Sequence, residues 1–234
     1  MHFGLGPSVD DPLSAWQAMF IPMEMEEHLR SFTVRSVEGA TVPLVRSSWT
    51  YYDAGRPPIP DTTPDWTLAF AGAGLLLAIV LAGLGGAAAT GRRGPRKGFL
   101  AVAIPWLAAV GSMGLLMGLL WAFTDHVDTR ANLNLWHATP LHLALAAVAW
   151  PLCGGRPWAR RFGRWLAMGV GGLTLVGLGV QALPGVSQAN GEFLVLLAPA
   201  NLAVAWACWR LAGGREREAG AGTDGRVSGV TVEE

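Results

Sequence analysis

The segment TLAFAGAGLLLAIVLAGLGGAAA, residues 67–89, carries no charged side chain. A helix needs about 20 consecutive apolar residues to cross the hydrocarbon core of a membrane, and this segment meets that requirement. Three further segments do the same, at residues 99–123, 165–183 and 193–212. The mean hydropathy of the chain, +0.35, is high for an ordinary soluble domain. The sequence therefore predicts an all-α integral membrane bundle.

A fifth apolar segment is shorter. It begins near Leu141 with LHLALAAVAWPLC and can be extended only from Thr139 to Gly155. It would form a short membrane-spanning helix. The alternative is a re-entrant segment, which would reverse the last two helices and place their basic loops on opposite sides of the membrane. The charges therefore favour about five transmembrane helices.

The distribution of basic residues predicts the orientation of the helices. Lysine and arginine together number 17, as do aspartate and glutamate, so the zero net charge argues against a nucleic-acid partner. Basic residues gather in the loops 90–98 and 156–164 and in the tail from Arg210 onward, whereas 124–138 holds one and 184–192 holds none. Basic loops favour the cytoplasmic side. We expect the N-terminus outside and the C-terminus in the cytoplasm.

The first 66 residues predict a short mixed α/β extracytoplasmic segment. Pro22 can open a helix that continues to Arg30, and FTVRSV, a Glu38-Gly39 turn and ATVPLVRSSWTYY predict a β-hairpin. Four prolines then form a stiff linker to the membrane, at Pro57, Pro58, Pro60 and Pro64. So short a segment has little core of its own, and residues 1–15 have neither the basic region nor the apolar core of a signal peptide. We expect residues 1–66 to be the end of a truncated periplasmic domain, followed by a bundle at 67–212 and a disordered cytoplasmic tail at 213–234.

The densest group of polar residues lies in TDHVDTRANLNLWH, residues 124–137, on the predicted external side. The candidate site residues are Asp125, His126, Asn132, Asn134, His137 and His142. One interpretation is a solvated loop with helix caps. A second is that histidines at the membrane boundary meet a lipid headgroup or a reactive carbonyl. A third is a divalent metal held with the help of Asp128, but the spacing matches no established metal motif, so we expect no metal and no cofactor.

Other polar residues have simpler interpretations. The amides of Asn132 and Asn134 can bind phosphate or carbonyl oxygens, or they can satisfy the backbone of their own loop. Gln181 and Asn201 are lone polar residues in or near the spans and are expected to form hydrogen bonds between helices. The two cysteines, Cys153 and Cys208, lie in or at the edge of apolar segments and predict neither a disulfide nor a metal site. No catalytic residue is identified.

Three short motifs together resemble one family. They are FTDH at 123–126, NLNLW at 132–136 and TPLHL at 139–143. This pattern is similar to the membrane part of Lnb-like bacterial proteins, which carry an N-terminal periplasmic domain followed by membrane helices. The stretch PLSAWQAMFIP at 12–22, followed by MEMEEHL, resembles the end of that periplasmic domain.

The resemblance implies a lipid-facing acyl-transfer system at the outer face of the bacterial cytoplasmic membrane. Characterised members move an acyl chain from a lipid to the N-terminal amine of lipoproteins. The cysteine- and histidine-bearing catalytic part of the family would lie upstream of residue 1, so we expect this chain alone to lack transferase activity. The expected partners are membrane lipids, lipoproteins and a periplasmic domain, with His126, Asn132 and Asn134 binding a headgroup or ordering the loop.

Two other functions compete with this one. The chain can instead be a non-enzymatic membrane scaffold or assembly partner, whose glycine-rich helix faces bind other helices. A small transporter is disfavoured, because the spans lack mid-membrane charges and pairs of broken helices.

Overall fold

The computed structural model divides the chain into two compact units, Asp11–Pro64 and Met1–Asp10 with Asp65–Glu234. The residues that it describes are 4–7, 10, 14, 20–52, 55, 64–125, 127–186 and 188–213. The predicted linker prolines before Pro64 and the predicted disordered tail after Gly213 lie outside the described residues.

The smaller unit contains one helix and one hairpin. Helix α2 spans Pro22–Ser31 and has proline in its first turn, where the missing backbone N–H costs nothing. Strands β1, Thr33–Arg35, and β2, Thr41–Pro43, pair antiparallel with Val34 opposite Val42. Gly39 supplies the positive φ of 84° that the connecting turn requires. The helix and hairpin predicted from the sequence are confirmed, with shorter strands than expected.

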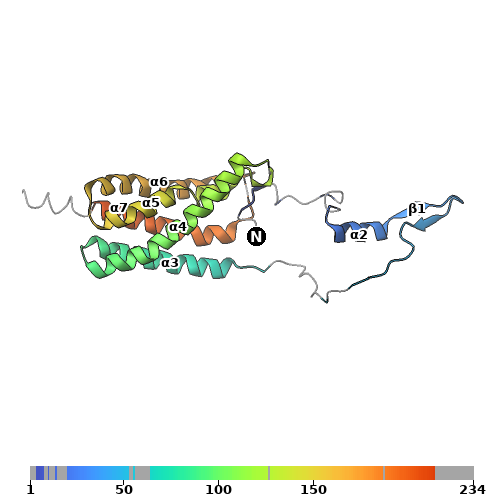
Figure 1. Ribbon diagram of the computed structural model, residues 1–234, viewed down its shortest axis with the longest axis horizontal. Coiled ribbons are helices and arrows are strands. Elements are labelled where there is room, and N and C mark those ends of the chain that lie inside the picture. Colours follow the sequence, from blue (N-terminus) through green and yellow to red (C-terminus); the bar gives the residue numbers. More distant parts are fainter. Residues whose placement is uncertain are drawn as a thin grey trace, which may run out of the picture. The chain divides into compact units, whose positions relative to one another are not determined.

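The larger unit is a helix bundle (Figure 1). Its elements are α3 Thr67–Ala89, α4 Arg93–Phe123, η2 Val127–Thr129, η3 Leu133–Trp136, α5 Leu141–Cys153, α6 Pro157–Gln181 and α7 Gly191–Gly213. Among the described residues, four helices are long and apolar enough to cross a membrane: α3, α4, α6 and α7. The predicted all-α membrane bundle is confirmed.

The helices pack around a shared core. Helix α3 contacts α7 and α4, α6 contacts α7 and α5, α4 contacts α5, and a smaller contact joins α5 to α7, so each helix has at least two neighbours. Figure 1 shows α4 inclined to the other helices. The shared core includes Leu81, Phe99, Leu107, Leu145 and Val204, all completely buried or nearly so. Close packing of α3 on α7 requires Gly74, because a Cβ there would lie 2.5 Å from the Val195 carbonyl oxygen.

Two helices begin earlier than their apolar segments. Helix α4 begins at Arg93 and α6 at Pro157, because the basic residues before each apolar segment join its first turns. Pro157 suits the first turn of α6. At 1.5 Å per residue the 31 residues of α4 extend about 46 Å, well beyond a hydrocarbon core of about 30 Å.

Helix α5 is too short to cross by itself. Its 13 residues extend about 20 Å. Near its start, His142 lies against Gly111 of α4, and at its other end Cys153 lines a small hollow together with Arg96 of α4. Helix α5 therefore covers one part of the bundle depth, and the chain before it, up to Pro140, occupies the rest.

Candidate functional site

The connection between α4 and α5 folds back into the bundle. The backbone carbonyl of Ala138 packs directly on Gly114 of α4, and Trp136 and His137 pack on Gly177 of α6. A Cβ atom at either glycine would overlap these groups. Gly114 lies nine residues before the last residue of α4, about 14 Å along the helix. The polar loop predicted to be external is thus largely buried between α4 and α6.

Four buried amide side chains form a network at this end of the bundle. Gln188 donates from Nε2 to Asn132 Oδ1 at 3.3 Å, and its Oε1 accepts from the Leu133 backbone N–H at 2.9 Å. Asn190 donates from Nδ2 to Asn134 Oδ1 at 2.6 Å. Because residues 188 and 190 precede α7 and the asparagines precede or lie within η3, the network joins two loops that are far apart in the sequence.

Asn132 has two roles in this network. Its Oδ1 also accepts from the backbone N–H of Asn134 at 2.9 Å and so caps η3, which supports the backbone-satisfying interpretation of this asparagine. Its Nδ2 donates to the thioether sulfur of Met117 at 3.4 Å. A thioether is a weak hydrogen-bond acceptor.

The N-terminal residues attach to the same loops. The Leu5 carbonyl accepts from Gln188 Nε2 at 2.8 Å, and the Gly6 backbone N–H donates to the Asp128 carbonyl at 2.6 Å. Asp10 Oδ2 accepts from the Ala189 backbone N–H at 2.7 Å. Leu5, Gly6 and Asp10 therefore link the loop after α4 to the loop before α7.

His137 lies beneath the amide network and is completely buried. Its Nε2 lies 3.4 Å from Gln181 Nε2, and its backbone carbonyl accepts from Asn201 Nδ2 at 2.7 Å. Its Nδ1 is buried without a hydrogen-bond partner among the described residues. Burial lowers the pKa of His137 to about 4, so the ring is neutral near pH 7.

His142 is also completely buried, in the first turn of α5. Its Nδ1 lies 3.0 Å from the Thr139 carbonyl oxygen, which fixes the ring at the start of the helix. Asn201 of α7, close to this ring, accepts from Trp106 Nε1 of α4 at 3.2 Å. The predicted hydrogen bonds between helices are thus confirmed for Asn201, and His142 faces the bundle interior.

The candidate residues from the sequence divide into two groups. The structure brings Asn132 and Asn134 together in the amide network, with His137 beneath it and His142 nearby, whereas Asp125 is exposed. His126 lies outside the described residues. Within the described part of the chain, no three His, Cys, Asp or Glu side chains are placed to hold a metal ion.

An open cavity of about 520 Å³ adjoins the network, a size typical of small-molecule sites. Its walls come from α4, α6 and the buried loop: Trp121, Ala131, Asn132, Leu133, Leu135, Trp136, Leu173 and Val180. Asn132 is the polar side chain among these largely apolar residues. The cavity can hold an apolar chain and present its polar end to the amides.

Sequence reasoning missed Gln188 and Asn190. They stand in a short polar stretch before α7 that resembles any surface loop, and their partners lie 56 residues away. The sequence did hold one indication of this network, because both loops that we predict to be external contain amide side chains.

These features define a polytopic membrane protein whose helix bundle is closed at one end by a buried polar loop. Residues 72–204 match the family model described as the Lnb transmembrane domain, and the chain belongs to this family. The matched residues run from α3 to α7 and include the four amides of the network. No curated protein and no solved structure matches the chain.

Proposed function

We propose that this chain is the membrane module of a lipoprotein-modifying acyl-transfer protein of the bacterial cytoplasmic membrane. The observation that carries the proposal is the junction of an apolar cavity with a buried amide network at Asn132. An acyl chain in the cavity would bring its ester group to this junction. The Asn132 Nδ2 donor can then exchange the weak Met117 acceptor for an ester or phosphate oxygen.

The module would bind and orient the lipid and leave the covalent chemistry to an external domain. The only two thiols of the chain, Cys153 and Cys208, are buried, and Cys153 lies at the end of α5 remote from the amide network. Neither can act as a nucleophile at the cavity. The buried, neutral His137 would help to keep the site in a single arrangement, since a charged ring there would require a partner.

Narrowing the cavity tests this function. Leu173→Trp places an indole in its wall, and Leu76→Trp on the exposed face of α3 is the matched control. Each substitution is made in the chromosomal gene, and the N-terminal peptide of an abundant lipoprotein is analysed by mass spectrometry. We expect the N-acylated fraction to fall at least tenfold with Leu173→Trp and to remain normal with Leu76→Trp, with equal membrane levels of both variants.

Normal acylation in the Leu173→Trp strain would contradict the proposed cavity. Normal lipoprotein termini in a strain that lacks the gene, together with a subunit that co-purifies with the chain, would instead support the membrane scaffold.

A further inference from the structure

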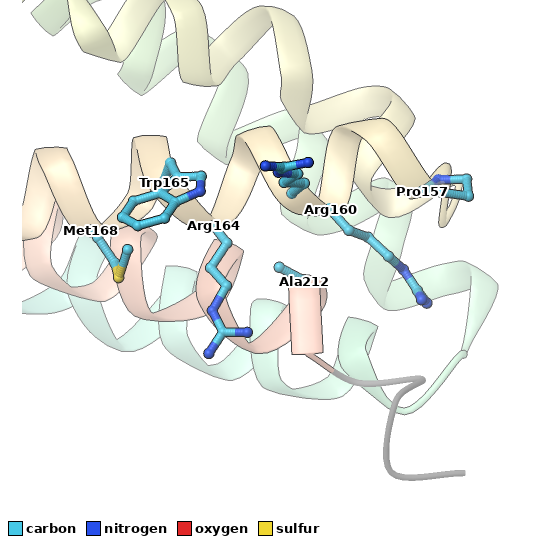
Figure 2. Close-up of a pocket in the computed structure, with 7 residues that line it drawn as sticks. Pro157, Arg160, Arg164, Trp165, Met168 and Ala212 are labelled. Carbon is cyan, nitrogen blue, oxygen red and sulfur yellow. The ribbon is translucent and has the colours of Figure 1, made fainter. Parts of the chain in front are cut away.

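The opposite end of the bundle carries a second cavity, of about 570 Å³. It is lined by the first turns of α6 and the last residues of α7: Pro157, Arg160, Arg161, Arg164, Trp165, Met168 and Ala212. Figure 2 shows Arg160 and Arg164 extending from α6 on either side of Ala212. Arg160 lies 17 residues before Gly177, about 26 Å along α6, so this cavity is separate from the amide network.

The charges around this cavity are unbalanced. Three arginines line it and no acidic side chain does. In the described part of the bundle, acidic residues lie at the other end: Asp65 precedes α3, Asp125 and Asp128 follow α4, and Glu192 is in the first turn of α7. The Nε of Arg160 is buried and has no hydrogen-bond partner among the described residues. Arg160 as a whole is half-buried and Arg161 and Arg164 are exposed, so the three side chains can present their charge to the cavity, and an anion there would supply the missing partner of the Arg160 Nε.

The helix itself adds to this positive charge. The arginines lie in the first turns of α6, where the helix dipole is positive and does not compensate their charge. The side chain of Arg164 is held over the ring of Trp209 on α7, 5.9 Å from its centroid. The cavity at this end, called the chamber below, is thus positively charged, and Trp209 positions one of its arginines, Arg164.

An apolar groove of about 260 Å³ continues from this chamber along the α6–α7 surface. Met168 lines both hollows. The groove is otherwise lined by Ala167, Gly171, Gly172, Leu175, Leu202, Ala205, Trp206 and Trp209, none of them charged. A Cβ at Gly172 would meet nothing within 4 Å. Helix packing therefore does not require glycine at this position, and the missing side chain leaves space in the groove.

We propose that this end of the bundle binds one anionic phospholipid, with the phosphate among Arg160, Arg161 and Arg164 and an acyl chain in the groove beside Gly172. The adjoining groove favours a lipid over free phosphate, because only a lipid presents an anion and an apolar chain together. This site is independent of the proposed acyl transfer, since it lies at the other end of the bundle.

Native mass spectrometry of the purified full chain in detergent tests the charge requirement. Dioleoyl phosphatidylglycerol is the probe, and dioleoyl phosphatidylcholine is the neutral reference. The double variant Arg160→Gln/Arg164→Gln should lose at least tenfold in phosphatidylglycerol affinity. The control Arg92→Gln/Arg93→Gln removes the same charge from the exposed start of α4, where Arg92 is the N-cap and Arg93 the first helical residue, and should bind as the original chain does. Equal losses in both variants, or none in the first, would overturn the proposal.

Gly172→Leu separates a lipid from free phosphate. The added side chain fills the groove and leaves the arginines in place, so phosphatidylglycerol binding should fall several-fold. Unchanged lipid binding in this variant, with displacement of the lipid by inorganic phosphate, would assign the chamber to a free anion and overturn the lipid assignment. A chain ending at Gly213 should bind as the full chain does. A tenfold gain on removing residues 214–234 would show that the tail occupies the chamber and would likewise overturn it.

Discussion

Burial changes what each polar side chain of the α4–α5 connection can do. Asn132 and Asn134 would be ordinary hydrated amides on a surface loop, but in the bundle their hydrogen bonds hold two distant loops together. His137, beneath them, is completely buried, which disfavours its protonated form. The amide network is stable while the His137 ring is neutral, because a charge buried beside these amides would have no partner.

The buried histidine predicts sensitivity to acid. The native pKa of His137 is about 4, whereas an unfolded histidine titrates near 6.5, so the unfolded chain binds more protons between these values. Stability is therefore fully present above pH 6.5 and falls as the pH drops toward 4, by about 2 kcal/mol for this group. Thermal unfolding in detergent, followed by tryptophan fluorescence at pH 7.5 and 4.5, measures the effect.

His137→Gln should reduce this acid sensitivity, because glutamine cannot take up the proton. His28→Gln, in the separate unit that contains α2, should leave it as it is. An equal loss of stability between the two pH values in all three proteins would show that His137 does not titrate as expected.

Helix α4 has two glycines one turn apart, and only one of them is required by the packing of the buried loop. Gly114 lies under the Ala138 carbonyl, whereas a Cβ at Gly118 would meet nothing within 4 Å. Close approach of the buried loop therefore requires glycine at one position and not at the other. Gly177 of α6 meets the same requirement for a different contact, because the side chains of Trp136 and His137 pack against it.

Gly114→Ala should lower the free energy of unfolding by about 1–3 kcal/mol, because the methyl group forces the buried loop away from α4. Gly118→Ala should be neutral or stabilising by up to about 1 kcal/mol, since alanine favours the helix. Unfolding midpoints in the same detergent compare the two variants. A similar midpoint for both would mean that the loop moves freely and is not packed as described.

Helix boundaries show how far the sequence predicts the elements. Uninterrupted apolar residues predict α3 at Thr67–Ala89, while the early starts of α4 and α6 were missed because hydropathy does not follow a helix into its basic first turns. The position of η3 was missed for another reason. A polar segment predicts solvent, and its burial depends on Gly114 and Gly177, which belong to other helices.

At the scale of the whole molecule, the two ends of the bundle differ in charge. The first turns of α4 and α6 are basic, and Arg96 and Arg160 line one small hollow there. The other end holds the amide network and is contacted by Leu5 and Asp10 of the N-terminal residues. The sequence predicts this polarity from its loops, but it does not predict that polar groups also fill the interior of the second end.

The charge asymmetry predicts the orientation in the membrane. Pro184→Cys lies in the loop after α6 and Gly94→Cys in the basic first turn of α4, both exposed, whereas the native cysteines are buried. A membrane-impermeant maleimide should label Pro184→Cys in intact cells and Gly94→Cys only after permeabilisation, because basic loops stay in the cytoplasm. The original chain should stay unlabelled. Labelling of Gly94→Cys alone in intact cells would reverse the orientation.

The short length of α5 affects how a lipid could reach the interior of the bundle from the bilayer. Helix α5 lies between α4 and α6 only as far as Leu141. Beyond Leu141, η3 packs between these two helices, and the cavity beside Trp121 and Leu173 opens there. The bundle surface is open at this cavity, which lies between α4 and α6. In the proposed function a donor lipid would arrive there by two-dimensional diffusion, turn its ester toward Asn132, and leave by the same gap without ever being lifted out of its leaflet.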